Sequence, residues 1–335
     1  MSLLDVDGVT HRYGPETDDR PVLDAVDLHL DDRDIVAVVG ESGCGKTTLG
    51  RLAVGLARPV DGQIRFDGRD VWSLRGRDRL GYRRAVQLVQ QDPYASLNPG
   101  LTIENTLGDA LLYHRLVTRR QLPAKLVELL ADVGLDATPE FLRRFPHQLS
   151  GGQRQRVAIA RAMSLQPRLV VADEATSMLD VSMRVSILDL LLSFRRERSL
   201  AYLFISHDFG VVRYFAQGGR VIVMFYGVVV EAGPTEQVIR QPRHPYTYLL
   251  LQAIPVPDPA AARRRAAVDT DARTEAPPAR TGCVFSNRCP WADERCRQTA
   301  PPTIEIAPGH TTACWRPEQI PTETVTVRRG APDVA

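Results

Sequence analysis

The stretch that most constrains the fold is GESGCGKTT (residues 40–48), which directly follows the apolar run IVAVV (35–39). It matches the pattern G-x-x-x-x-G-K-[ST], and TLGRLAVGL (48–56) continues it as a helix. Between a strand and a helix, glycines let backbone N–H groups wrap a phosphate, and the helix N-terminus adds a favourable dipole. The stretch therefore predicts a nucleotide-binding loop rather than an ordinary glycine-rich turn.

The residues of this loop have expected contacts with a nucleotide. Lys46 reaches the β- and γ-phosphates, and Thr47 offers its hydroxyl to Mg²⁺. The nucleotide-binding residues expected here are Gly40, Ser42, Gly43, Cys44, Gly45, Lys46, Thr47 and Thr48.

A site of this kind needs an acid to hold the metal, and LVVADE (169–174) provides two at the end of a second apolar run. Asp173 is placed to hold Mg²⁺ through water. Glu174 lies outside the strand, where it can polarise the attacking water. Two solvated acids at a strand end would look the same, but the phosphate loop upstream favours the metal and catalytic roles.

Much of the chain alternates between strand-like and helix-like runs. Besides 35–39, the apolar runs are LVVA (169–172), YLFI (202–205) and VIVM (221–224). Continuous apolar runs are typical of parallel strands that are covered on both faces. The fold class is therefore α/β, with the plan of a P-loop nucleotide triphosphatase.

Two regions are expected to be helical. In VSMRVSILDLLLSFRRER (181–198), four apolar residues predict one buried face of an amphipathic helix: Val181, Val185, Leu188 and Leu192. Residues 92–165 contain helix-like runs with little strand between them, so we expect a helical subdomain inserted in the α/β core.

Charge and apolar content exclude several classes of protein. The net charge is +2 over 335 residues, so no strong field favours nucleic acid and no nucleic-acid partner is expected. The N-terminus lacks the features of a signal peptide, and the most apolar stretch (221–230) is far short of the ~20 residues that a spanning helix needs. We therefore expect a cytoplasmic protein, which can still dock on a membrane protein.

A second glycine-containing helix start lies at LSGGQRQRVAIARAM (149–163). Ser150 and Gln153 form the pattern of a capping box, and Gly151 and Gly152 leave backbone N–H groups bare. A helix cap alone would explain this pattern, but one nucleotide does not obviously need two phosphate-binding helix N-termini. The economical solution is a head-to-tail dimer, in which each ATP lies between one subunit's phosphate loop and the other's Ser-Gly-Gly.

LSGGQ together with the phosphate loop resembles the ATP-binding cassette family. The resemblance implies that Tyr13, in HRYG, stacks on adenine, and that Asp180, in SMLD, belongs to a loop crossing the dimer interface. It also implies that Gln91, in VQQDP, senses Mg²⁺ and the attacking water, and that His207, in FISHD, contacts the γ-phosphate. One departure, Ala175 where proline is commoner, carries no chemistry.

The site implied by this resemblance is an ATPase site that uses Mg²⁺. Its catalytic residues are Glu174, His207 and Gln91, and its Mg²⁺ ligands are Thr47, Gln91 and Asp173. The ATP-binding residues beyond the phosphate loop are Tyr13, Ser150, Gly151, Gly152, Gln153 and Asp180.

Three further segments, QDPYASLNP (91–99), HPYTYLLLQAIPVPDP (244–259) and GCVFSNRCP (282–290), resemble the ATPase subunits of oligopeptide and dipeptide importers, a group that includes nickel importers. SGGQRQR is more like the second ATPase of the pair that such importers commonly use. The resemblance implies that ATP hydrolysis powers import of peptides or related small solutes. Nickel or another solute remains an alternative cargo.

The same resemblance implies partners that the chain itself does not contain. They are a second, paralogous ATPase subunit, two membrane permease subunits and an extracytoplasmic substrate-binding protein. The chain would lie at the cytoplasmic face of the membrane, peripheral through the permeases. Soluble cassette proteins of DNA maintenance are a rival class. Such proteins carry a long coiled coil between the phosphate loop and LSGGQ (149–153, here called the signature), and this chain has no sustained heptads there.

Four of the five cysteines lie near the C-terminus, at Cys283, Cys289, Cys296 and Cys314. Four thiolates suit either tetrahedral Zn²⁺ or an iron–sulfur cluster, and their spacing alone leaves the metal open. Resemblance to the peptide-importer subunits favours a [4Fe–4S] cluster. We expect this cluster to stabilise the segment structurally, well outside the ATP motifs, with redox sensing as the alternative role. We expect His310 to be a surface residue, with a place as substitute ligand as the alternative.

The expected organisation has four parts. An ATP-binding cassette domain spans 1–254, with its helical subdomain at about 92–165. A Pro- and Arg-rich linker follows at 255–280, then a cysteine-rich region at 281–320 and a loose tail at 321–335.

Overall fold

The computed structural model describes residues 2–14, 20–254, 279 and 281–321, and the expected linker and tail therefore lie almost entirely outside it. Within these residues the main sheet has eight strands in the order β11-β12-β10-β9-β3-β8-β7-β6. Strands β9, β3, β8, β7 and β6 run parallel, which confirms the parallel sheet predicted from the apolar runs. Their bounds are Arg220–Phe225, Ile35–Val39, Ala201–Ser206, Leu169–Asp173 and Val86–Val89.

The core lies on both faces of this sheet. In β3, every residue is buried, and its side chains alternate between two apolar clusters. Ala37 and Val39 join the cluster that includes the helices after β6, whereas Val36 and Val38 join the cluster shared with the N-terminal strands. The run IVAVV is uniformly apolar because it has no solvent face.

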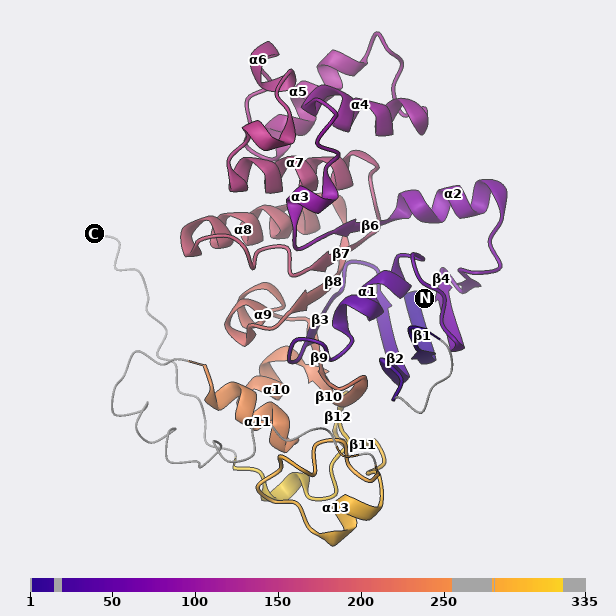
Figure 1. Cartoon of the computed structure of the whole chain (residues 1–335), viewed down its shortest axis with the longest axis vertical. Helices are drawn as coiled ribbons and strands as arrows, with labels where there is room; N and C mark the ends of the chain where they lie inside the picture. Colours follow the sequence, from indigo (N-terminus) through magenta and orange to yellow (C-terminus); the bar gives the residue numbers. More distant parts are fainter. Residues whose placement is uncertain (1, 15–19, 255–278, 280, 322–335) are drawn as a thin grey trace, which may run out of the picture.

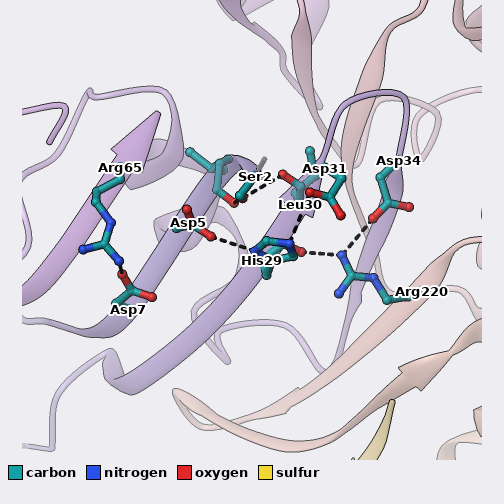
Figure 2. A network of polar contacts seen from close by, with 10 residues as sticks. Ser2, Asp5, Asp7, His29, Leu30, Asp31, Asp34, Arg65 and Arg220 are labelled. Atoms are coloured by element: carbon teal, nitrogen blue, oxygen red, sulfur yellow. Dashed lines mark hydrogen bonds and ion pairs between the residues drawn. The ribbon is translucent and has the colours of Figure 1, made fainter. Parts of the chain in front are cut away.

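A second, antiparallel sheet was not predicted from the sequence. Its strand order is β2-β1-β4-β5, and the bounds are Leu23–Asp31, Ser2–His11, Asp61–Phe66 and Arg69–Asp70. Figure 2 shows how it is fastened to the main sheet. The Arg220 guanidinium on β9 donates to the His29 carbonyl on β2 (2.6 Å) and to Asp34 Oδ2 (2.8 Å), while Asp5 Oδ1 on β1 lies 2.7 Å from His29 Nδ1.

In Figure 1, helices α1 and α2 (Lys46–Ala53 and Gly76–Ala85) lie on the same side of the main sheet as the N-terminal strands β1, β2 and β4. Between β6 and β7 the described elements are all helical, and Figure 1 shows them stacked beyond the β6 edge. This agrees with the helix-like runs expected there, and that 92–165 is a separate subdomain stays a prediction. Their bounds are α3 Pro93–Ser96, α4 Ile103–Tyr113, α5 Leu122–Asp132, α6 Pro139–Leu142, a 3-10 turn Pro146–Gln148 and α7 Gly151–Ser164.

Helix α8 (Val181–Arg198) has the predicted bounds, but its expected buried face was partly wrong. Val181 and Val185 are exposed, at 76% and 43%. The buried residues are Ile187, Leu188, Leu191 and Phe194, so the first turn of the helix projects from the core. A helical-face pattern identifies an apolar stripe but cannot tell which end of it the fold covers.

The C-terminal part of the chain extends the main sheet. Strand β10 (Val228–Pro234) pairs with β9 and with β12 (His310–Thr312), and β12 pairs with β11 (Ile304–Ala307). The α-helices described in this part are α9 Phe209–Phe215, α10 Thr235–Arg240, α11 Pro245–Gln252 and α13 Glu294–Gln298. We call residues 281–321 the extension; Figure 1 shows it at the end of the molecule opposite α4–α6.

His310, expected at the surface, is 1% exposed, and this expectation was wrong. Its Nε2 lies 2.7 Å from Glu231 Oε1 on β10. Among the described helices, none is both long and apolar enough to cross a lipid bilayer.

Candidate functional site

The parallel strands bring the expected catalytic groups to one edge of the sheet, the edge formed by the carboxyl ends of these strands. In register, Val39 at the end of β3 lies opposite Ser206 at the end of β8, and Ile205 lies opposite Asp173 at the end of β7. The phosphate loop follows β3, and His207 follows β8. Because carboxyl ends of parallel strands share an edge, segments that are far apart in sequence meet there.

Close backbone approach explains the glycines of the phosphate loop. A Cβ on Gly40 would lie 2.2 Å from the Met224 carbonyl oxygen on β9, so only glycine fits. Gly45 has φ of 103° and precedes the first residue of α1 without a side-chain cap. The first N–H groups of α1 therefore have no side-chain acceptor from the cap, which suits a helix start that receives a phosphate.

Lys46 and Thr47 contact the phosphate loop and the first of the two acids, respectively. The buried Lys46 ammonium donates to the carbonyls of Gly40 (2.8 Å) and Glu41 (2.9 Å). The Thr47 hydroxyl donates to Asp173 Oδ1 over 3.2 Å, although 126 residues separate them. A hydroxyl beside a carboxylate is a donor set that Mg²⁺ accepts, so these residues fit the expected ion.

Burial raises the pKa of Asp173, and the neighbouring Glu174 charge acts in the same direction. The Thr47 hydrogen bond and the Lys46 charge oppose it. A bound divalent cation would favour the ionised carboxylate.

Glu174 and His207 form a pair just beyond the carboxyl ends of β7 and β8. His207 Nδ1 lies 3.2 Å from Glu174 Oε1, with His207 half exposed and Glu174 only 15% exposed. The Glu174 amide donates to the Ile205 carbonyl over 3.0 Å, which fixes the acid beside the end of β8. The structure thus brings together two of the three residues that were expected to be catalytic.

Two other expected residues, Tyr13 and Gln91, lie at the rim of this site. Tyr13 is 57% exposed, and its hydroxyl is 3.3 Å from Thr48 Oγ1, so its ring stands beside the start of α1. Gln91 is exposed and follows β6, whose Val89 pairs with Ala172 at the β7 end. Gln91 therefore lies at the same sheet edge as Asp173.

The signature segment forms the capping box predicted for it. Ser150 Oγ accepts from the Gln153 amide (3.2 Å), and Gln153 Oε1 accepts from the Ser150 amide (3.1 Å). Gly152 leaves no room for a side chain, because a Cβ there would lie 1.5 Å from Met183 Cε. Met183 belongs to α8, whose cap Asp180 accepts from the Met183 amide, so residues 149–163 contact the first turn of the helix that follows the expected interface loop.

Two family models match the chain. The first, described as ABC transporter, covers residues 23–177, and the second, described as Oligopeptide/dipeptide transporter, C-terminal region, covers residues 230–296. A probable peptide ABC transporter ATP-binding protein of Sinorhizobium fredii is 41% identical over 320 residues, which cover 93% of this chain and 89% of that protein. The chain belongs to the ABC transporter family.

Other members of the ABC transporter family are similar over much of their length. The oligopeptide transport ATP-binding protein AppF of Bacillus subtilis is 41% identical over 88% of this chain and 89% of its own. A solved dimeric ATP-binding cassette in a post-hydrolysis state, bound to ADP and Pi, has a TM-score of 0.60 and 28% identity, covering 69% of this chain and 98% of that one. A likeness of fold alone is found to the solved structure of cbiO1 of Clostridium perfringens, part of the ABC transporter complex cbiONQ, with a TM-score of 0.60 at 24% identity over 71% of this chain and 90% of that one.

Sequence reasoning missed several residues that support the phosphate loop of this ABC protein. The Glu41 amide donates to the Tyr246 hydroxyl over 2.8 Å, and the Cys44 carbonyl accepts from the Gly227 amide over 2.9 Å. Arg288 of the extension forms an ion pair with Glu41. The motif HPYT (244–247) marks Tyr246 by resemblance only, and nothing in the sequence signals that it touches the loop.

This ion pair corrects one expectation. The cysteine-rich segment was expected to stand well outside the ATP motifs, yet Arg288, next to Cys289, contacts the phosphate loop directly. A long intervening segment says nothing about distance in space, because the chain can return to its starting point.

The four C-terminal cysteines line one small cavity of about 20 Å³, with His244 also on its wall. Burial raises the pKa of Cys289 to about 12 and that of Cys314 to about 11. Throughout the described residues, however, no group of three or more His, Cys, Asp or Glu is arranged to hold a metal ion. The described residues thus show no formed zinc or iron–sulfur site, and the metal expected at these cysteines stays a prediction.

Proposed function

We propose that this chain is the ATP-hydrolysing subunit of an importer for peptides, acting at the cytoplasmic face of the membrane through permease subunits. The observation that carries the ATPase part is the sheet edge where the phosphate loop, Asp173, Glu174 and His207 converge. Peptide import is supported by the matched C-terminal region and by relatives whose names state peptide transport. No feature of the site favours the alternative of nickel as cargo.

The side chains have distinct roles in the proposed hydrolysis. Lys46 offsets charge on the β- and γ-phosphates, and Tyr13 stacks on the adenine. Thr47 and Asp173, with Gln91, would hold Mg²⁺, which neutralises charge that develops on the phosphates. Glu174 accepts a proton from water as the water oxygen attacks the γ-phosphorus and the bond to the β–γ bridging oxygen breaks. His207, 3.2 Å from Glu174, orients this acid and contacts the γ-phosphate.

A head-to-tail dimer completes the site. The α7 N-terminus, with Ser150 and Gly151 exposed, presents bare backbone N–H groups to a second subunit's γ-phosphate. The exposed Met178 and Val181 beside Asp180 provide apolar surface for the same interface. The second ATPase is proposed to be a paralogue, and an extracytoplasmic protein is proposed to deliver the substrate.

The experiment is ATP-driven peptide uptake into proteoliposomes that contain the chain with its permeases and partner ATPase. Ser150→Arg should abolish ATPase-coupled uptake, because a large cation then fills the place of the γ-phosphate. Ser73→Arg, at an exposed serine far from α7, is the matched control and should leave uptake unchanged. If Ser150→Arg retained uptake, or if the wild-type complex hydrolysed ATP without moving any peptide, the proposal would fail.

We also propose a [4Fe–4S] cluster at Cys283, Cys289, Cys296 and Cys314. Its support is the convergence of four thiols on one cavity wall. One Zn²⁺ would need its four sulfurs ~3.8 Å apart around a single centre, and no such set occurs among the described side chains. A cluster bonds each thiolate to a different iron, so its sulfurs stand farther apart.

The test is iron, sulfide and zinc analysis of anaerobically purified protein, with the visible absorption spectrum. About four irons and four sulfides per chain are expected, and Cys289→Ser should lose them. Protein that contains neither iron nor sulfide contradicts the cluster, and zinc at one equivalent restores the alternative metal.

A further inference from the structure

Arg288 connects the extension to the phosphate loop. Its Nη1 donates to Glu41 Oε2 (2.8 Å) and its Nη2 donates to Glu41 Oε1 (2.7 Å), across 247 residues of sequence. The Arg288 side chain is 11% exposed, so the pair is largely withdrawn from water on the arginine side. Two parallel hydrogen bonds fix both the distance and the orientation of the carboxylate, which a single contact cannot do.

Glu41 is bonded both to the lysine of the phosphate loop and to α11. Its carbonyl, together with that of Gly40, accepts the Lys46 ammonium, and its amide donates to the Tyr246 hydroxyl. The side chain, the carbonyl and the amide of this one residue are therefore each held by a different group. A shift of Glu41 moves an acceptor of the lysine that reaches the phosphates.

Arg288 is itself held on an aromatic platform. Its guanidinium carbon lies 5.3 Å from the Phe225 ring centroid and 5.7 Å from that of Phe285. Phe225, Tyr246 and Phe285 lie in mutual contact, with centroids 4.6 to 5.4 Å apart. These rings come from β9, α11 and the extension, so the arginine is set by the junction of three elements.

From this geometry we infer that Arg288 is a positioning residue for the phosphate loop, through which docking of the extension sets the affinity of the ATP site. The inference rests on the proposed ATPase function. It assigns to the extension a role beyond that of a structural staple. By linkage, ATP binding should in turn stabilise docking of the extension to the same degree.

Binding of a non-hydrolysable ATP analogue with Mg²⁺ to the full-length chain tests this inference, together with steady-state ATPase kinetics of the assembled transporter. Arg288→Ala should raise Kd and KM for nucleotide about three- to tenfold, the range for a charged bidentate pair that is partly exposed to solvent. The kcat should change less than about twofold, because no group that touches the reacting atoms is altered. Arg288→Lys should give an intermediate Kd, because lysine keeps the positive charge but cannot form the two parallel hydrogen bonds to Glu41.

The matched control is Arg295→Ala, in which an exposed arginine of the same extension, stacked on Trp315, is removed. It should leave the nucleotide Kd unchanged. A double-mutant cycle gives a further check: Glu41→Ala and Arg288→Ala should each weaken binding, and the double variant should be no weaker than either. Hydrogen exchange supplies a readout independent of turnover, in which the analogue should protect residues 282–290 in wild type but not in Arg288→Ala.

The outcomes separate this inference from the proposed function. Wild-type chain that binds no nucleotide overturns the function itself. Wild-type binding with an unchanged Kd in Arg288→Ala overturns the positioning role alone, and so does an equal loss in Arg288→Ala and Arg295→Ala. If Arg288→Ala does not fold, Arg288→Lys and Glu41→Ala decide: unchanged Kd in both would reject the inference.

Discussion

Glu174 has an unusual backbone conformation as well as a proposed role in catalysis. Its backbone lies in the left-handed region, with φ of 48°, which is sparsely populated for residues other than glycine. The Ser177 amide and hydroxyl both bond to its carbonyl (3.0 Å each), and its own amide is bonded to Ile205. These bonds hold the turn that carries the acid, so that the carboxylate meets His207 at the end of β8.

At this scale, we expect Glu174→Gln to keep the fold and ATP binding but to lower kcat by more than about a hundredfold. The isosteric amide cannot accept the proton from water, and general-base loss is typically worth 10²–10⁴. Steady-state phosphate release and nucleotide binding measure the two effects separately. Glu197→Gln, at an exposed position of α8, is the control and should not change either. Turnover within tenfold of wild type would mean that another group is the base.

Helix α7 is the element that joins the signature to the segment after Gln91. Arg154 is 1% exposed, and it donates to the carbonyls of Pro146 and Leu149 (2.8 Å each). Its guanidinium carbon lies 3.4 Å from the ring centroid of Tyr94 on α3. One turn beyond the middle of α7, Arg161 donates to the Ser96 carbonyl. Two arginines of α7 therefore contact α3, and one of them, Arg154, stacks on the exposed Tyr94.

We expect Arg154→Ala to lower the free energy of unfolding by about 2–4 kcal/mol, since it strands buried carbonyls and leaves a cavity. Tyr94 is 62% exposed, so Tyr94→Ala should cost less than about 1 kcal/mol. Urea unfolding of the two variants measures the difference. An equal loss of unfolding free energy in the two variants would contradict the assignment of Arg154 as the buried residue that stabilises this contact.

Glu231 connects three parts of the molecule through its buried carboxylate. Its carboxylate is fully buried and accepts from the amides of Arg243 (2.7 Å) and His244 (2.9 Å), with His310 Nε2 at 2.7 Å. These partners precede α11 or lie on β12 of the extension. A single carboxylate thus joins the main sheet, the helix that supports the phosphate loop and the cysteine-rich extension.

Glu231→Ala is expected to destabilise the protein by about 3–5 kcal/mol, because buried donors lose their acceptor. The extension should become susceptible to proteolysis before the rest of the chain unfolds. Thermal unfolding combined with limited trypsin digestion measures both effects. Glu305→Ala, which removes an exposed carboxylate of β11, is the comparison and should cost less than about 1 kcal/mol. An unaltered digestion pattern in Glu231→Ala would contradict this role.

Local pattern was sufficient for the parallel strands, helix α8, the phosphate loop and the capping box of Ser150. In each, the residue types follow from the covering of a strand on two faces or from the bonding needs of one helix end, and both are encoded over a few neighbouring residues. The family resemblance added the order of the ATP motifs, and the sheet register then brought Thr47, Asp173 and Glu174 together.

Tertiary structure alone decided what contacts these local units. The antiparallel sheet, the burial of His310 and the Arg288–Glu41 pair depend on segments up to 247 residues apart. Such contacts leave no periodic trace, because an arginine that serves a distant carboxylate has the same sequence environment as one in solvent. The sequence alone therefore predicted the residues of an ATP site, whereas only the fold revealed that the cysteine-rich extension reaches the phosphate loop.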